Sequence, residues 1–270
     1  MRRALVVAAG LLVVLGAPGV ARARRGVRPL FEPTDLELED PGVAEVDLQA
    51  GPIRGQGPWR LVVPDVELDL GLLRWLELDV DGAYALEAPA GTFKFQDAAP
   101  DNLWVALKVG LWDWADEGKG DDDVSAWALG GQVGPKLPVA AGSHAVGIEA
   151  LALLGHVLWR THTVLNAGMF VDPYPSATSD RPVGLELGLD FDCDLDKAQH
   201  YQVTAELSGV KFLSSDPDQL LATAGVGWTP YPPYTQINLV GLVGFLEGSD
   251  KYGVLLGVTQ KIGLWGKPRS

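Results

Sequence analysis

Acidic side chains are the residues of this chain whose type and spacing could support chemistry. From Asp190 to Asp196, aspartates occupy every second position in the pattern D-x-D-x-D-x-D. An EF-hand calcium loop needs Gly at its sixth position and Glu at its twelfth, where this chain has Leu195 and Tyr201. The run is therefore not an EF-hand. On an extended strand its carboxylates would lie roughly 7 Å apart on one face. A loose cation site and a row of solvated acids both fit that spacing, and we expect solvated acids.

The residues that could support catalysis are scattered. A barrel phospholipase needs a serine nucleophile close to a histidine in a defined strand pair. Ser143 and His144 stand in a glycine-containing loop with no recognisable orienting partner. The GKG sequence at residues 118–120 lacks the preceding spacing of a phosphate-binding loop. The remaining histidines are His156, His162 and His200. We therefore predict that the chain is not an enzyme and holds no cofactor and no metal.

The element that must position the aspartates is the stretch 181–194, RPVGLELGLDFDCD. Every second residue from Val183 to Cys193 is apolar, and the residues between them are Gly, Glu or Asp. A strand projects alternate side chains to opposite faces, so this segment predicts a strand with one apolar and one acidic face. About eleven residues long, it exceeds the usual five or six and matches the ~9–11 that a tilted strand needs to cross a bilayer.

The same alternation recurs along the chain and predicts an all-β fold of about 12 strands. We expect a transmembrane up-and-down antiparallel β-barrel over residues 43–265. Two segments are apolar on both faces, so the sequence does not fix which residues point inward; they are residues 124–137 and 145–158. The segments with clear alternation are 43–50, 65–72, 76–82, 103–111, 162–172, 183–193, 202–209, 236–245 and 254–264.

If the apolar faces meet lipid, the acidic faces line a lumen. Lys108 and Lys261 are the basic residues that clearly lie on the same face as these acids. A pore lined by carboxylates favours cations, although interior carboxylates can also serve only to hold water. We predict an acidic lumen that tolerates cations and leave open whether it is continuous. The predicted lumen-facing acids are Asp65, Glu67, Asp69, Glu77, Asp79, Asp81, Glu186, Asp190, Asp192 and Glu206.

Connections and aromatic residues give further support for a membrane barrel. Short turns alternate with longer polar loops, a habit of outer-membrane barrels, although the long acidic stretch 115–123 falls on the short side. Aromatic side chains suit the two interfaces of a bilayer. At the long-loop ends stand Trp59, Tyr84, Tyr174, Phe245 and Tyr252. The tryptophans predicted to form a girdle at the short-turn ends are Trp75, Trp112, Trp114, Trp159, Trp228 and Trp265.

The N-terminus predicts export. Two arginines, an apolar run and the small-x-small sequence at residues 21–23 form a signal peptide over residues 1–23, with a membrane anchor as the alternative. Residues 24–42 are expected to be an extension with little fixed structure, and residues 266–270 a C-terminal tail. Cys193 is the only cysteine, so no intramolecular disulfide can form. The net charge of -14 argues against nucleic acid as a partner.

A soluble periplasmic β-sandwich or a structural barrel that transports nothing remains the alternative, since each also buries one face of every strand. Three stretches resemble an outer-membrane transporter family associated with phenol-degradation pathways (MetA-pathway-like); they are PDVELDLGLLRWLELDVDGAYAL, KLPVAAG and YGVLLGVTQKIGLW. The resemblance covers most of residues 60–265 and implies a barrel in the outer membrane of a Gram-negative bacterium. Outer-membrane lipid, the outer-membrane assembly machinery and a small solute are the expected partners.

Overall fold

The computed structural model describes residues 38–55, 57–88, 96–112, 125–139, 145–173, 175–176, 178–231 and 234–266. The predicted signal peptide lies outside these residues. So do Trp114, Tyr174, the acidic stretch 115–123, and Ser143 with His144.

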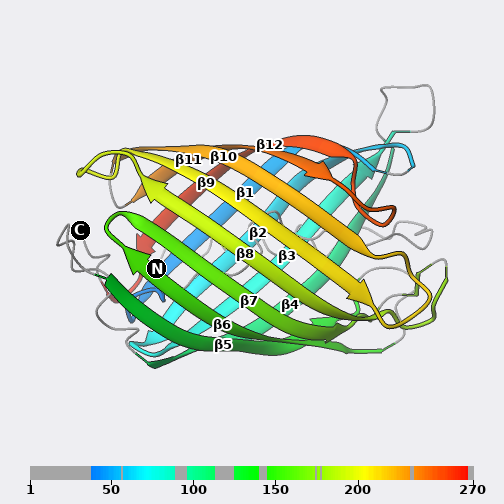
Figure 1. Ribbon diagram of the computed structural model, residues 1–270, viewed down its shortest axis with the longest axis horizontal. Helices are drawn as coiled ribbons and strands as arrows, with labels where there is room; N and C mark the ends of the chain where they lie inside the picture. Colours follow the sequence, from blue (N-terminus) through cyan, green and yellow to red (C-terminus); the bar gives the residue numbers. More distant parts are fainter. Residues whose placement is uncertain are drawn as a thin grey trace.

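The chain folds into a closed barrel of 12 antiparallel strands, as the alternation predicted (Figure 1). Each strand pairs with its sequence neighbours, and the barrel closes where Val43 of β1 meets Gly263 of β12. This pairing leaves the sheet without an edge and excludes the β-sandwich. The strands are β1 (Val43–Arg54), β2 (Trp59–Leu73), β3 (Leu76–Glu87), β4 (Gln96–Trp112), β5 (Ser125–Leu137), β6 (Gly147–Leu158), β7 (Thr161–Val171), β8 (Val183–Asp194), β9 (Tyr201–Phe212), β10 (Gln219–Tyr231), β11 (Thr235–Gly244) and β12 (Tyr252–Gly263).

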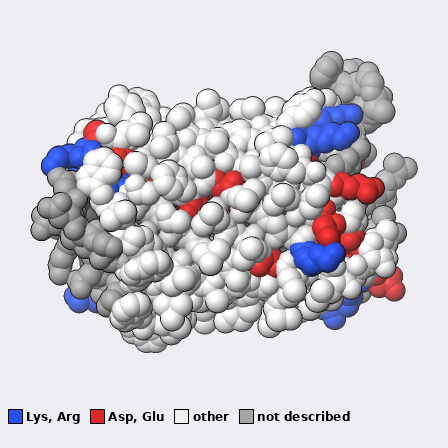
Figure 2. Space-filling view, viewed as in Figure 1, with Lys and Arg blue, Asp and Glu red and all other residues white. Residues whose placement is uncertain are grey.

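Alternation along each strand separates an exposed apolar face from a buried face. On β8, Leu185, Leu187 and Leu189 are 45%, 58% and 45% exposed, whereas Gly184 and Gly188 are buried. Because the barrel is closed, the buried face of each strand lines the enclosed interior, or lumen. In Figure 2 the basic side chains lie toward the two ends of the barrel, and the surface between them is mostly uncharged, with a few small acidic patches. No helix in the described part of the chain is long and apolar enough to cross a membrane.

The structure also fixes the orientation of β5 and β6, which the sequence left open. Gln132 and Lys136 of β5 and Glu149 and Leu153 of β6 are buried, and their sequence neighbours are mostly exposed. Apolar residues occupy both faces here because the lumen beside these strands is itself partly apolar, as the side chain of Leu153 shows.

Several strands extend beyond their predicted ends. The alternating segments 43–50, 65–72 and 103–111 are too short, because β1 continues to Arg54, β2 begins at Trp59 and β4 begins at Gln96. A β-bulge in β2 interrupts the alternation on which the prediction depended. Val62 pairs with Ala85, whereas Asp65, three residues later, pairs with Ala83. The extra residue moves the inward positions from even to odd numbers, so the strand does not continue one simple alternation.

The ends of the barrel differ in their connections. The turns after β2, β6 and β8 lie at the end where β1 begins and β12 finishes, which we call the terminal end.

The described tryptophans of the predicted girdle are exposed at or near this end; they are Trp75, Trp112, Trp159, Trp228 and Trp265. Trp127 near the start of β5, which was not predicted, is 49% exposed and lies opposite His156 of β6. At the opposite end the rings of Trp59 and Tyr252 pack edge to face at 5.6 Å.

Candidate functional site

Six carboxylates form two rows on the lumen face of β1, β2 and β3. In one row Glu45 lies opposite Asp69, and Asp69 lies opposite Asp79. In the next row Asp47 lies opposite Glu67, and Glu67 lies opposite Asp81. Strand register alone therefore produces this arrangement, because inward positions recur every second residue on three adjacent strands. We call these six residues the acidic grid; they are Glu45, Asp47, Glu67, Asp69, Asp79 and Asp81.

One further carboxylate flanks the acidic grid on each side along the barrel. Asp65, opposite Gln49, is 3% exposed on one side, and Glu77, opposite Gly71, is 1% exposed on the other. The structure thus brings together six of the ten predicted lumen acids, namely Asp65, Glu67, Asp69, Glu77, Asp79 and Asp81. The prediction omitted Glu45 and Asp47, although both stand at alternating positions in the same sequence pattern.

The other predicted acids lie on the opposite wall of the barrel. Glu186, Asp190 and Asp192 are half-buried on β8, and Asp190 faces Glu206 across the β8–β9 pair. Thr223 of β10 donates a hydrogen bond to Glu206 at 3.3 Å. Since β2 and β8 are six strands apart in a ring of 12, these acids do not join the grid.

Lysines inside the barrel make ion pairs with some of its acids. The ammonium group of Lys108 lies 3.4 Å from Glu77, and that of Lys261 lies 3.1 Å from Glu45. Lys136 pairs with Glu149 and, at 3.3 Å, with Asp172. Lys136 and Glu149 were missed because the orientation of their strands was not predictable from two apolar faces.

A short segment preceding β1 enters the lumen beside the grid. The backbone amide of Glu39 donates a hydrogen bond to Glu77, and the carboxylate of Glu39 accepts one from Lys261 at 2.7 Å. A Cβ at Gly71 would lie 2.2 Å from the carbonyl oxygen of Glu39, so this close approach requires glycine. The expectation of little fixed structure is therefore wrong for residues 38–42.

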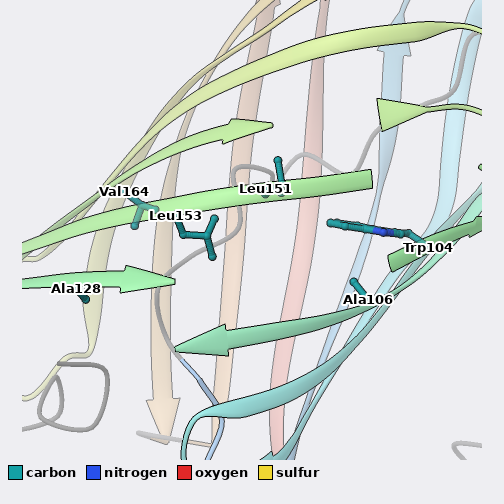
Figure 3. Close-up of a cluster of buried hydrophobic side chains, with 6 residues drawn as sticks. All are labelled: Trp104, Ala106, Ala128, Leu151, Leu153 and Val164. Atoms are coloured by element: carbon teal, nitrogen blue, oxygen red, sulfur yellow. The ribbon is translucent and has the colours of Figure 1, made fainter. Parts of the chain in front are cut away.

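Apolar side chains occupy the lumen on the wall formed by β4 to β7. Trp104 is 3% exposed, and its indole nitrogen donates a hydrogen bond to the carbonyl of Gly134 at 3.2 Å. Leu38 of the entering segment packs against this cluster. Figure 3 shows the side chains gathered in one part of the interior, and they are Trp104, Ala106, Ala128, Leu151, Leu153 and Val164. The lumen therefore contains an apolar cluster on β4 to β7 as well as the acidic grid on β1 to β3.

The last aspartate of the D-x-D-x-D-x-D run stabilises a turn. Asp196 accepts hydrogen bonds from the backbone amides of His200 and Tyr201 at 2.8 and 3.0 Å. Partial desolvation is the largest influence and would raise the pKa of Asp196, but these bonds and the His200 ring together lower that pKa. Since Asp190 and Asp192 are on β8 and Asp196 is in the turn beyond it, the run does not close around one centre.

The described histidines do not form a common site. His156 is stacked with Trp127 on the outer face of the barrel at 4.3 Å between ring centroids. His162 is opposite Asp192 across the β7–β8 pair, and His200 lies 3.1 Å from Asp196 in a turn. Each of these three described histidines thus has a separate structural environment.

The barrel resembles solved outer-membrane channels in fold. An outer membrane channel from Pseudomonas putida F1 matches with a TM-score of 0.59 and 12% identity, over 87% of this chain and 100% of that one. The NanC porin matches with a TM-score of 0.58 and 8% identity, over 80% of this chain and 100% of that one. No protein-family model matches the sequence. No curated protein matches it either.

Proposed function

We propose that the protein is an outer-membrane β-barrel that passes or binds a small solute and prefers cations to anions. The acidic grid is the observation that carries this proposal. Six carboxylates on three adjacent strands create a strongly negative wall that would attract cations and repel anions. Lys108 and Lys261 offset part of this charge through Glu77 and Glu45.

The outer surface supports a location in the outer membrane. Leucines such as Leu187 and Leu256, 58% and 57% exposed, would be costly in water but suit contact with acyl chains. A closed barrel also satisfies the hydrogen bonds of its backbone within the hydrocarbon layer. The channel and the porin of similar fold support the same location. With the predicted signal peptide, we propose that the chain is exported, inserted by the outer-membrane assembly machinery, and related to the transporter family that it resembles.

Ion selectivity tests the proposal. The purified full chain should give a reversal potential in planar bilayers, under a KCl gradient, of the sign expected for potassium preference. Neutralising the grid with Asp69→Asn and Asp79→Asn should reduce that preference. Asp218→Asn is the matched control, because Asp218 lies in the connection between β9 and β10. A preference for chloride in the unmodified protein would contradict the proposal.

A barrel that transports nothing is the second candidate, and the filling of the lumen favours it. Leu38 packs against the apolar cluster, Glu39 lies beside the grid, and buried residues such as Glu149 and Leu153 have no exposed surface. Absence of current both in the full chain and in a variant whose entering segment is displaced would favour this candidate. Under either candidate, we propose that the protein is not an enzyme.

A further inference from the structure

We propose that the acidic grid binds a divalent cation of the calcium type between β1, β2 and β3, with Asp69 at its centre. One carboxylate oxygen from each of Glu67, Asp69 and Asp79 lies within 4.8 Å of the others. The same holds for Glu45, Asp47 and Asp69. Asp69 belongs to both groups, so the two sets form one continuous surface of oxygen ligands.

The strand register makes a bound cation energetically favourable. Like charges directly opposite one another on neighbouring strands destabilise a sheet, and the grid contains four such pairs. Two of these pairs involve Asp69, which lies opposite both Glu45 and Asp79. A divalent ion between the strands would turn this repulsion into shared attraction. It would also offset the cost of holding carboxylates away from bulk water.

Gln132 gives a second and independent indication of a ligand. Its side chain lies on β5, only 2% exposed, and its amide nitrogen donates a hydrogen bond to Asp79. That bond places the amide group beside Asp79 of the grid. Among the described residues no group donates a hydrogen bond to the amide oxygen of Gln132, although this atom is buried. An amide oxygen beside carboxylates is a ligand that calcium uses in proteins.

The chemistry of the surrounding groups selects the type of ion. The ligands on offer are carboxylate and amide oxygens, with no histidine or cysteine in either group of acids. Such oxygen sets suit hard cations and not zinc or copper. Thr259 of β12 donates a hydrogen bond to Asp47, which fixes one edge of the grid.

This inference does not require transport, because an ion bound in the lumen can be measured in detergent without any current. The full chain, refolded in micelles and freed of metal with a chelator, is titrated with Tb³⁺ while tryptophan is excited. Trp104 stands opposite Asp81 across the β3–β4 pair and can sensitise a nearby lanthanide. We expect saturable luminescence that Ca²⁺ displaces. We also expect Ca²⁺ to raise the thermal unfolding temperature of the unmodified barrel.

Substitutions then locate the ion. Asp69→Asn should weaken Ca²⁺ binding by roughly 100-fold, because it removes the shared ligand. Asp190→Asn, the same change on the opposite wall, should leave binding intact. Gln132→Leu should weaken binding by about tenfold, and Gln132→Glu should preserve it. The heat-modifiable shift on a gel shows that each variant has folded. Absence of saturable binding, or equal affinity in Asp69→Asn and the unmodified protein, would overturn the proposal.

Discussion

The ammonium group of Lys261, on the last strand, lies 2.7 Å from the carboxylate of Glu39, a residue that precedes the first strand. The same ammonium group lies 3.1 Å from Glu45. Its side chain is 17% exposed, so water screens these contacts only in part. One lysine therefore joins three parts of the chain where the barrel closes: β12, β1 and the segment inside the lumen.

Lys261→Met should destabilise the barrel, because it leaves Glu39 and Glu45 beside each other without their shared cation. We expect a loss of about 2–4 kcal/mol in the free energy of unfolding, measured by urea titration in lipid vesicles with tryptophan fluorescence. Lys211→Met is the matched control, since Lys211 pairs with Asp218 on the surface and is 68% exposed. Its loss should be below about 1 kcal/mol. Equal losses in the two variants would contradict a special role for Lys261.

Gly71→Val should displace the entering segment from the lumen. The new Cβ would lie 2.2 Å from the carbonyl oxygen of Glu39 and 2.3 Å from that of Asp40, so these atoms must move. Displacement can be measured as faster maleimide labelling of Glu39→Cys in a Cys193→Ser background. Gly241→Ala is the control, because its nearest atoms are 4.0 Å away. If the protein is a pore, Gly71→Val should also raise its single-channel conductance.

The fold could be predicted because membrane and lumen impose opposite demands on alternate residues. The spacing of Leu185, Leu187 and Leu189 predicts the apolar face of β8 from the sequence alone. The same reasoning stopped at β5 and β6, where Leu153 points to an apolar lumen and Leu154 to the outside. Hydropathy cannot distinguish two apolar environments, so the orientation of those strands required the closed barrel.

The candidate site was less predictable than the strands that carry it. Alternation predicted that Asp69 and Asp79 both face the lumen. Only the strand register shows that they lie opposite each other. The position of Glu39 in the lumen depends on Gly71 and Lys261, two residues far from it in sequence. Such long-range contacts leave no periodic pattern, which is why the segment before β1 was expected to lack fixed structure.

The exposed leucines of β8 allow the contact with lipid to be tested by depth. Leu187→Arg places a charge near the middle of the strand, where its removal from acyl chains should cost about 2–4 kcal/mol of folding free energy. Leu213→Arg is the same substitution beyond the end of β9, at a position 60% exposed, and should cost at most about 1 kcal/mol. Urea unfolding in vesicles compares the two. A soluble environment around the barrel would make the two costs similar and small.

At low pH, the contacts of Asp218 that hold the connection between β9 and β10 should be lost. The ammonium group of Lys211 lies 2.6 Å from Asp218 and is the largest influence on its pKa. Together with the backbone amide of Phe212 at 3.1 Å, it lowers the pKa of Asp218, although partial desolvation acts in the opposite direction. A carboxyl group with a lowered folded-state pKa stabilises the structure fully above its ordinary pKa of about 3.9. That stabilisation is lost as the pH falls through the lower folded value. Amide exchange at Phe212 should therefore stay slow at neutral pH and, after correction for the intrinsic rate, accelerate only in strong acid. Asp218→Asn should remove this pH dependence, and an unchanged profile in that variant would show that another group anchors the connection.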